Sequence, residues 1–342
     1  MIEDKPKKKI VFIVNPISGT SKKHRIVEVI GKRIDRSRFE PEIWYTEYAG
    51  HASILAGEAV KKGFDAVIAV GGDGTVNEVA SSLVHTSTAL GIIPCGSGNG
   101  LARHLSLPLS PEKAVDIINH FEIHLLDSGL CDGKPFFCTC GVGFDAFISE
   151  QFSMSGKRGP ITYVENILLK GLNYQPETYT IEDEQGSLLG KAFLISCANA
   201  SQYGNNAFIA PHASMKDGLL DVVVIEPFSK IEAPQIALAL FNKTLPKNSH
   251  VKIFRAKKIR ITRQNEGVMH CDGDPIKGGR VIEVEMLQKS LHVVVNPDAH
   301  RSSKPVMQIF TESFGSWHRL QWVFLRQGVQ IRRTFRKIIN TK

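Results

Sequence analysis

The residues best suited to chemistry follow a short apolar run in the first quarter of the chain. Residues 66–70 are Ala-Val-Ile-Ala-Val, which predicts a strand buried on both faces, and Gly-Gly-Asp-Gly follows at 71–74. A glycine turn between a strand and a helix exposes backbone N–H groups that bind an anion such as a phosphate. We expect Gly71, Gly72 and Gly74 to let the backbone turn with positive φ and approach a ligand without interference from a Cβ, and the helix to begin at Asn77.

Asp73 distinguishes this turn from a simple phosphate site. A carboxylate repels a phosphate unless a metal ion or a transferable proton lies between them. The combination therefore favours phosphoryl transfer over phosphate binding alone. The alternative is a tight turn with an exposed aspartate, because Gly-Gly-Asp-Gly is a short motif.

Two further junctions repeat this arrangement of strand, loop and helix. Residues 9–14 predict a buried strand that leads into Asn-Pro-Ile-Ser-Gly-Thr at 15–20, and the basic residues 22–25 head the next helix. Residues 90–94 predict another strand, followed by the loop Cys-Gly-Ser-Gly-Asn-Gly at 95–100. Ligands of open α/β sheets gather at the carboxyl ends of the strands, so we expect residues 15–20, 46–51 and 71–77 to line one crevice.

The change in sequence texture near residue 121 predicts two domains. Up to that point strands and helices alternate, which indicates an open α/β sheet. Beyond it, short β-rich segments separated by Gly, Asn and Asp indicate an antiparallel β-sandwich. Helical insertions are expected at 159–171 and 231–241. We predict an α/β domain at 1–121, a β-sandwich domain at 122–296 and a C-terminal extension at 297–342. The strands expected in the second domain are 136–140, 177–183, 191–198, 220–225, 251–254, 258–262, 281–286 and 291–295.

The composition describes an ordinary globular protein. With 342 residues, 42% hydrophobic and 22% charged, the chain is long enough for two cores. The net charge of +8 lies largely at the two ends, and we expect no nucleic acid partner. The first residues lack the apolar core of a signal peptide, and no apolar run is long enough to span a bilayer. The six cysteines lack paired Cys-x-x-Cys spacing, so we expect free thiols rather than zinc ligands, and a cytoplasmic protein.

The C-terminal extension has a composition of its own. It carries no acidic residue after Glu312, and its apolar stripe is surrounded by arginines. Such a basic amphipathic segment suits the surface of an anionic membrane, where the protein would associate peripherally at the inner face. The alternative is a helix packed on its own protein or on a second subunit, as in a homodimer.

Taken together, these motifs resemble those of the diacylglycerol kinases and sphingosine kinases. The resemblance covers residues 9–296. It rests on six segments in this order, namely residues 15–19, 71–78, 94–99, 141–145, 217–221 and 271–274. The resemblance implies an N-terminal nucleotide-binding domain like that of NAD kinases and phosphofructokinases, a C-terminal β-sandwich that holds the lipid, and an active site between them.

The resemblance also implies which residues bind ATP and magnesium. The residues expected around ATP are Asn15, Pro16, Ile17, Ser18, Gly19, Thr46, Gly71, Gly72, Asp73, Gly74, Thr75, Val76, Asn77 and Ser97. Asp73 would lie beside the phosphates and magnesium, and Asp127 matches a further magnesium-linked carboxylate. Gly100 stands where the bacterial diacylglycerol kinases have an aspartate, so one member of that carboxylate network is missing. Thr20 replaces a frequent lysine, whose charge Lys22 or Lys23 would supply.

Three further sites are implied for the β-rich domain. Asp274 stands where most relatives have a glutamate that accepts the proton of the lipid hydroxyl; either Asp274 or Asp73 is the base, unless Asp272 and Asp274 only shape a turn. Asp145 matches the residue that contacts the lipid head in sphingosine kinases, where a sphingoid amine would bind. The expected ligands of a structural magnesium ion are Ser214, Asp217 and Leu219, although Asp217-Gly218 is equally a common turn.

The expected activity is transfer of the γ-phosphate of ATP, with Mg²⁺, to a hydroxyl of a lipid at a membrane surface. The acceptor would be a diacylglycerol or a sphingoid base, in phospholipid or sphingolipid metabolism. Two alternatives stay open. An NAD kinase shares Gly-Gly-Asp-Gly-Thr, although the 94–99 and 217–221 segments argue against it. A non-catalytic lipid or nucleotide sensor would fit the departures at Gly100 and Asp274.

Overall fold

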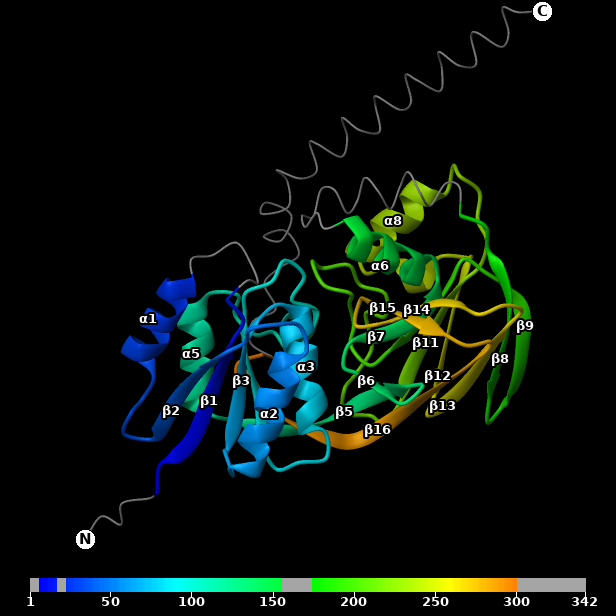
Figure 1. Cartoon of the computed structure of the whole chain (residues 1–342). Coiled ribbons are helices and arrows are strands. Elements are labelled where there is room, and N and C mark those ends of the chain that lie inside the picture. The colour runs from blue at the N-terminus through cyan, green and yellow to red at the C-terminus, as the bar shows by residue number, and fades with distance from the viewer. Residues whose placement is uncertain (1–5, 17–22, 156–173, 300–342) are drawn as a thin grey trace, which may run out of the picture. The chain divides into compact units, whose positions relative to one another are not determined.

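The computed structural model describes residues 6–16, 23–155 and 174–299, and Figure 1 shows its ribbon. The described residues up to Pro297 belong to one compact unit. The basic C-terminal segment and the helical insertion expected at 159–171 lie outside the described residues, as do Ile17, Ser18 and Gly19. The domain boundaries proposed above stay a prediction.

The N-terminal part is the expected open α/β sheet. Its first four strands run parallel in the order β2-β1-β3-β4. These strands are β1 (Lys8–Val14), β2 (Phe39–Tyr45), β3 (Ala66–Gly71) and β4 (Ala89–Pro94). The helices are α1 (Lys23–Arg33), α2 (His51–Lys61), α3 (Asp73–Leu83), α4 (Gly100–His104) and α5 (Pro111–His120).

Helices cover both faces of this sheet because its central strands are apolar on both sides. In β1, Phe12 packs in a core with residues of α1 and α5, whereas Ile13 packs in a second core with residues of α2 and α3. Both side chains are fully buried. In Figure 1, α1 and α5 accordingly lie together on one side of the strands, and α2 and α3 lie together on the other. Successive residues of a strand point to opposite faces, which explains the alternation.

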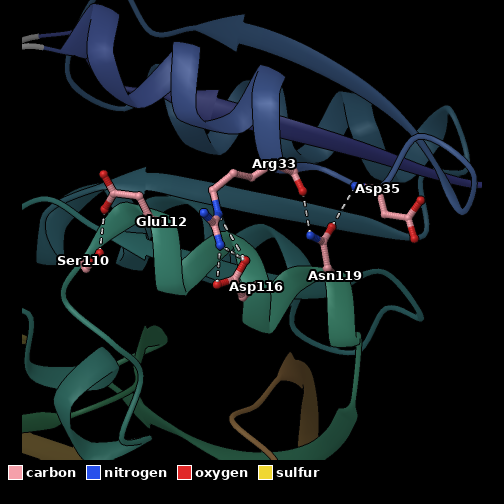
Figure 2. Close-up of polar contacts among 6 residues, drawn as sticks. All are labelled: Arg33, Asp35, Ser110, Glu112, Asp116 and Asn119. Atoms are coloured by element: carbon pink, nitrogen blue, oxygen red, sulfur yellow. Dashed lines mark hydrogen bonds and ion pairs between the residues drawn. The ribbon is translucent and has the colours of Figure 1, made fainter.

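Polar contacts join α1 to α5 (Figure 2). The guanidinium of Arg33 forms an ion pair with Asp116 at 2.8 Å. Asn119 donates from Nδ2 to the Arg33 carbonyl at 2.8 Å and accepts from the Asp35 N–H at 2.9 Å. These bonds satisfy backbone groups at the end of α1, where no partner within the helix remains.

The β-rich part contains two sheets that face each other. A six-stranded antiparallel sheet has the order β12-β11-β10-β7-β14-β15. Its strands are β7 (Thr139–Gly143), β10 (Leu194–Ala198), β11 (Leu220–Ile225), β12 (Val251–Ala256), β14 (Gly267–Cys271) and β15 (Asp274–Gly278). The facing strands are β5 (Ile123–Cys131), β6 (Lys134–Phe136), β8 (Glu177–Asp183), β9 (Gly186–Ala192), β13 (Lys258–Arg263) and β16 (Val281–Val294). The helical elements are α6 (Phe144–Ser155), α8 (Ala233–Phe241) and the 3-10 turn Leu245–Lys247. One core, with Tyr179 and Val222 among its residues, fills the space between the sheets.

The facing strands continue the sheet of the N-terminal part. The ten-stranded sheet runs β2-β1-β3-β4-β16-β13-β8-β9, with β5 and β6 paired beside β16. The link is β16, which pairs with β4 at Val293 and Leu90 and with β5 on either side of an irregularity between Leu287 and Leu291. We expected two separate strands at 281–286 and 291–295. A bulge bends a strand without ending it, so the two segments form one strand.

Some of the other expectations about secondary structure need correction, whereas the one about the cysteines is confirmed. The segments 136–140 and 191–198 are each divided between two strands, and β5, β14, β15, α5 and α6 were not expected. All six cysteines are free thiols, and every one except Cys95 is buried, as predicted. In the part of the chain that the structure describes, no helix is long and apolar enough to cross a membrane.

Candidate active site

The predicted nucleotide loops lie side by side at one edge of the sheet. Asn15, Thr46, Gly72 and Cys95 directly follow β1, β2, β3 and β4, and these strands are parallel neighbours. Hydrogen bonds continue the pairing into the loops: the Asn15 N–H donates to Val70 and the Thr46 N–H to Val14, at 3.2 and 3.0 Å. The structure therefore brings together the described residues predicted for ATP. Of these, Pro16, Gly74 and Ser97 are exposed.

The Gly-Gly-Asp-Gly segment differs from the expected turn. The helix begins at Asp73, four residues before Asn77, and Gly72 at its N-cap has φ −90°. None of Gly71, Gly72 and Gly74 has a positive φ, so the expectation of left-handed glycines was wrong. The reason is that the strand passes directly into the helix, which places the Asp73 carboxylate in the first turn, where the helix dipole favours a negative charge.

The glycines serve close packing instead. A Cβ built on Gly71 would lie 2.5 Å from the Thr75 side chain, and one built on Gly96 would lie 2.6 Å from the Gly72 Cα. The two glycine loops thus touch backbone to backbone. Gly74, in contrast, faces open space: a Cβ there would have no neighbour within 4 Å.

Asp73 holds the second glycine loop. Its Oδ2 accepts the Asn99 N–H at 2.8 Å and its Oδ1 accepts the Gly100 N–H at 2.6 Å. Burial raises the pKa of Asp73, and the charge of Asp272 adds to this, although the two N–H bonds oppose it. Asn99 has the left-handed conformation, with φ 50°, and its Oδ1 accepts the Gly96 N–H at 2.9 Å. Each Asp73 oxygen keeps a lone pair for a further partner.

Two of the residues predicted for ATP brace the loops. Asn15 Nδ2 donates to the Thr75 Oγ1 at 3.1 Å, and the Thr75 side chain is buried beneath Gly71. Val76 is also buried. The part of Asn15, Thr75 and Val76 in binding ATP stays a prediction. The backbone at the junction of β3 and α3 supports it better than these three side chains do.

The Asp-Gly turn between β14 and β15 meets α3. Asp272 and Gly273 both have positive φ, 50° and 87°, which is the geometry of a two-residue hairpin turn that favours Asp-Gly. Asp272 Oδ2 accepts from Asn77 Nδ2 at 2.8 Å and from the Phe137 N–H at 2.9 Å. Its Oδ1 accepts the N–H groups of Cys138 and Thr139 at 2.7 and 3.0 Å. Burial raises the pKa of Asp272, and these four donors oppose the rise. Asp272 is thus a fixed link between the N-terminal and β-rich parts.

The Asp274 carboxylate has a different environment from that of Asp272. It is the first residue of β15 and pairs with Cys271. Its carboxylate accepts no hydrogen bond from the described residues. The residue as a whole is exposed. Partial desolvation of its carboxylate nevertheless raises its pKa, and the charges of Asp272, Glu78 and Asp73 raise it further, whereas His270 lowers it. The carboxylates of the first glycine loop and of the Asp-Gly turn are therefore close enough to act on one another's protonation.

Asp127 lies with the predicted structural magnesium segment. Its Oδ2 accepts the Gly218 N–H at 2.8 Å and its Oδ1 accepts the Lys289 N–H at 2.7 Å, with the side chain buried. No hydrogen bond found for Asp127 reaches the glycine loops, so the structure does not join it to Asp73. Its role in a magnesium network stays a prediction.

The three residues predicted as ligands of that structural magnesium ion form a turn held by its own bonds. Ser214 Oγ accepts the Lys216 N–H at 3.2 Å, and Asp217 Oδ1 accepts the Leu219 N–H at 3.2 Å. Asp217 Oδ2 also lies 3.6 Å from Arg255 Nη1. A metal ion there stays a prediction. Among the described residues, no group of three His, Cys, Asp or Glu side chains could hold a metal ion.

Asp145 is already partnered by residues that the sequence did not indicate. Its Oδ2 accepts from Tyr203 Oη at 3.1 Å and lies 3.0 Å from His270 Nε2. The position of His270 directly before Cys-Asp-Gly-Asp was the available signal, because a residue next to a functional turn is held close to it. No pattern in the sequence indicated Tyr203.

The segment around Tyr203 also contacts the second glycine loop. The Asn205 N–H donates to the Gly98 carbonyl at 3.1 Å, and Arg103 Nε donates to the same oxygen at 2.9 Å. A Cβ on Gly100 would lie 3.3 Å from the Tyr203 carbonyl. The aspartate that bacterial relatives have at this position would therefore crowd the Tyr203 segment.

The geometry suits a nucleotide with a divalent cation. The first turn of α3 offers backbone N–H groups beside the open space at Gly74, as an anionic phosphate requires. Magnesium in phosphoryl-transfer sites is bound by one or two carboxylates, the phosphates and water, and Asp73 has lone pairs left for such a contact. Fold and site together consist of an open α/β part whose glycine-rich loops meet the acidic turn of a β-rich part.

Comparison with known proteins identifies the family. Residues 9–131 match the model of the diacylglycerol kinase catalytic domain, and residues 138–295 match the YegS C-terminal NAD kinase beta sandwich-like domain. The chain is 30% identical over 256 residues to a protein of Chromohalobacter salexigens named "Probable lipid kinase YegS-like", covering 72% of this chain and 81% of that protein. It is 28% identical over 304 residues to the diacylglycerol kinase of Bacillus subtilis, covering 84% and 96%. The chain belongs to the diacylglycerol kinase-like lipid kinase family.

A solved structure of a diacylglycerol kinase homologue from Bacillus anthracis has the same fold. Its TM-score is 0.70 at 22% identity, covering 85% of this chain and 98% of that one. This likeness confirms the expected architecture of an N-terminal α/β part and a C-terminal antiparallel β part.

Proposed function

We propose that the protein transfers the γ-phosphate of ATP, in the presence of Mg²⁺, to the hydroxyl of a lipid. The observation that carries this proposal is that the helix that begins at Asp73 meets the turn that precedes Asp274, so that two carboxylates from different parts of the chain lie near one site. The Asn77–Asp272 bond holds the two parts together there at 2.8 Å. A kinase of this kind needs a phosphate-binding loop and a proton acceptor that face each other.

The glycine loops would hold the nucleotide. The first turn of α3, from Asp73, would bind phosphate oxygens through its N–H groups, and Thr46 and Ser97 lie at the neighbouring strand ends. Magnesium, when bound, would neutralise the charge that develops on the phosphates. Asp73 is the described carboxylate placed to contact it, while its bonds to Asn99 and Gly100 fix the carboxylate in position.

The roles of the carboxylates follow from their partners. Asp272 is bound by four donors and serves as a fixed link. Asp73 is bound by two N–H groups. The pKa of both carboxyls is raised. Asp274 accepts no hydrogen bond within the described part of the chain, so both of its oxygens are open to a proton, whereas each Asp73 oxygen already holds one N–H group. We therefore assign the proton of the lipid hydroxyl to Asp274 rather than to Asp73.

The lipid would be met at a membrane surface by a protein that associates peripherally. The basic C-terminal segment supports this by its sequence alone. The family supports a lipid acceptor over NAD, since the curated relatives above are named as lipid or diacylglycerol kinases.

The test is transfer of labelled phosphate from ATP with Mg²⁺, offering a diacylglycerol, sphingosine and NAD in separate reactions. We expect a phosphorylated lipid and no labelled NADP. Asp274→Asn should lower kcat by at least about a hundredfold, as the loss of a general base does. Glu285→Gln, a carboxylate of β16 outside the site, is the matched control.

Phosphorylation of NAD with no lipid product would replace the proposal by an NAD kinase. ATP binding without transfer to any acceptor would favour the sensor. An Asp274→Asn variant with the wild-type rate would return the role of base to Asp73.

A further inference from the structure

The helix α8 is apolar on all of its sides. Of the nine residues from Ala233 to Phe241, only Gln235 is polar. One side packs on the protein: Ile236 and Ala239 are buried in a core that α8 shares with α6, β10 and β11. A helix that is apolar all round is normally buried all round, in a protein core or in a membrane. A second apolar side of α8 is therefore left without a covering layer.

This second side is exposed. The side chains of Leu238 and Phe241 are 42% and 43% exposed, and a spacing of three residues places them on one side of the helix. Ile231, in the turn that leads into α8, is 91% exposed, which is the highest value for a large apolar side chain in the described part of the chain. Neighbouring exposed apolar side chains mark an interaction site, whereas single ones do not. We call Ile231, Leu238 and Phe241 the α8 surface.

The turn that presents Ile231 is held by Glu232. Oε2 of Glu232 accepts the N–H and the hydroxyl of Ser229, at 2.8 and 2.7 Å. Oε1 of Glu232 lies 3.0 Å from His250 Nε2. The bonds from Ser229, and then the one with His250, lower the pKa of Glu232 to about 2. The carboxylate is thus engaged within the protein, and the turn that exposes Ile231 is braced by hydrogen bonds.

Lysines flank the α8 surface at both ends. Lys230 directly precedes Ile231, Lys243 follows Phe241 by two residues, and both lysines are exposed. Lys243 Nζ lies 4.3 Å from the centre of the Phe208 ring, which keeps this ammonium near the end of α8. Apolar side chains with cations beside them match an anionic bilayer, which attracts lysine at its surface and accepts apolar groups below it. A protein partner fits less well, because lysine is depleted in protein–protein interfaces.

We propose that the α8 surface docks the protein on an anionic lipid bilayer, with Ile231, Leu238 and Phe241 inserted below the head groups. A helix of nine residues is too short to span a bilayer, so α8 would lie within the interface. The inference deepens the proposed function, on which its purpose rests, although binding to a bilayer can be measured without phosphate transfer.

The position of α8 connects docking with the proposed base. Helices α6 and α8 cover the face of the six-stranded sheet that is turned away from the core between the two sheets, and Figure 1 shows them next to each other. The helix α6 also contacts β14 and β15, which flank the Asp-Gly turn, and β15 begins with Asp274. A bilayer at α8 would therefore meet the helical layer that packs on the strands of the base.

The experiment is flotation of the full chain with vesicles of phosphatidylcholine, with and without phosphatidylglycerol, in the absence of ATP. We expect binding that needs phosphatidylglycerol and weakens as the salt concentration is raised. Ile231→Ser should lower the partition coefficient on the order of tenfold, and Leu238→Ser combined with Phe241→Ser should lower it at least as much. Lys230→Gln should lower it about fivefold, because one cation near the surface is lost.

Leu189→Ser is the matched control. Leu189 lies in β9, outside the α8 surface, and is 71% exposed, so its substitution should leave the partition coefficient unchanged. Thermal melting of each variant separates weaker binding from a loss of folded protein. Ile231→Ser keeps the test decisive if the double variant fails to fold, since this side chain is almost fully exposed.

Each outcome supports the docking surface or overturns it. Vesicle binding that the α8 variants leave unchanged overturns it and assigns the bilayer to another segment, such as the basic C-terminal one. A complete lack of vesicle binding overturns it as well. A wild-type dimer that Ile231→Ser dissociates in sedimentation would make the α8 surface a contact between two copies of the chain.

The proposed function is tested separately from docking. Transfer of phosphate to a short-chain diacylglycerol dispersed in water needs no bilayer, so the α8 variants should keep the wild-type rate with this acceptor. Loss of docking with this transfer intact leaves the kinase standing. Docking through α8 without transfer to any lipid overturns the kinase and leaves the bilayer surface in place.

Discussion

Three aspartates close together in the site have three different environments. Asp73 accepts two backbone N–H groups, Asp272 accepts four donors, and Asp274 accepts none from the described residues. The same side chain therefore serves as a loop anchor, as a link between the two parts, and as a candidate base. The hydrogen-bond partners of each aspartate, rather than its residue type, therefore determine its role.

The raised pKa of Asp274 predicts the pH dependence of the reaction. A base acts only when it is deprotonated, so kcat/KM should fall as the pH is lowered through this pKa. Because the pKa is raised, the fall should begin above the ordinary range near 4. Glu78→Gln removes one of the charges that raise it and should move the midpoint to lower pH. The measurement is kcat/KM for the lipid as a function of pH.

Glu285→Gln again supplies the comparison, since its charge is not among those acting on Asp274. A midpoint that Glu78→Gln leaves in place, or moves to higher pH, would contradict the assignment of this limb to Asp274.

The sequence predicted the positions of these residues better than their roles. The motifs led us to expect Asp73 and Asp274 in one site, and the Asn77–Asp272 bond brings the two segments that carry them together. Asp272 accepts three of its hydrogen bonds from the N–H groups of residues 137–139. No local sequence pattern connects these residues with a turn more than a hundred residues later. The partners of Asp145 were missed for the same reason.

At the scale of elements, the glycine loops depend on contact between their backbones. Gly72 and Gly96 belong to neighbouring strand ends, and there is no room for a side chain between them. This contact lets Asp73 reach the N–H groups of Asn99 and Gly100. Small residues in both loops are thus a requirement of the site's architecture.

Gly96→Ala should therefore destabilise the protein. The new Cβ would lie 2.6 Å from the Gly72 Cα, so one loop must move, at a cost of about 1–3 kcal/mol. Gly74→Ala is the matched substitution, because its Cβ meets nothing within 4 Å and the residue is helical. It should be neutral or stabilising by up to about 1 kcal/mol. Urea unfolding of both variants measures the difference.

Equal stability of the two alanine variants would show that the loops are not in contact.

The sequence indicated both glycine loops but assigned the wrong reason for their glycines. It also placed the start of α3 four residues too late, because a helix that opens directly at a strand end has no separate turn to mark it.

At the scale of the whole molecule, the N-terminal and β-rich parts share one sheet. The sequence texture changes near residue 121, and the fold class inferred from it is confirmed. The texture could not show that β16, near the end of the chain, returns to pair with β4 and β5. Strand pairing between distant segments is not encoded in local periodicity, so the common sheet was missed while both of its halves were predicted.

Contacts between the N-terminal and β-rich parts hold the site together. Among them, the Asn77–Asp272 bond joins α3 to the turn that precedes the proposed base, Asp274. Asn77→Ala leaves the Asp272 carboxylate with three donors instead of four. A hydrogen bond to a charged group contributes about 1.5–3 kcal/mol, so the free energy of unfolding should fall by this amount. Since the turn that Asp272 holds also carries Asp274, kcat should fall as well.

Ser81→Ala is the control for this substitution. Ser81 lies one turn further along α3 and donates to Asn77 Oδ1 over 3.4 Å, a weak bond whose loss should change stability by less than about 0.5 kcal/mol. Urea unfolding followed by tryptophan fluorescence, with activity assayed on the same samples, measures both effects. If Asn77→Ala lowers kcat without lowering stability, the bond positions the base but does not hold the parts together. If it changes neither, α3 and the Asp-Gly turn are joined by other contacts, and the link through Asp272 is wrong.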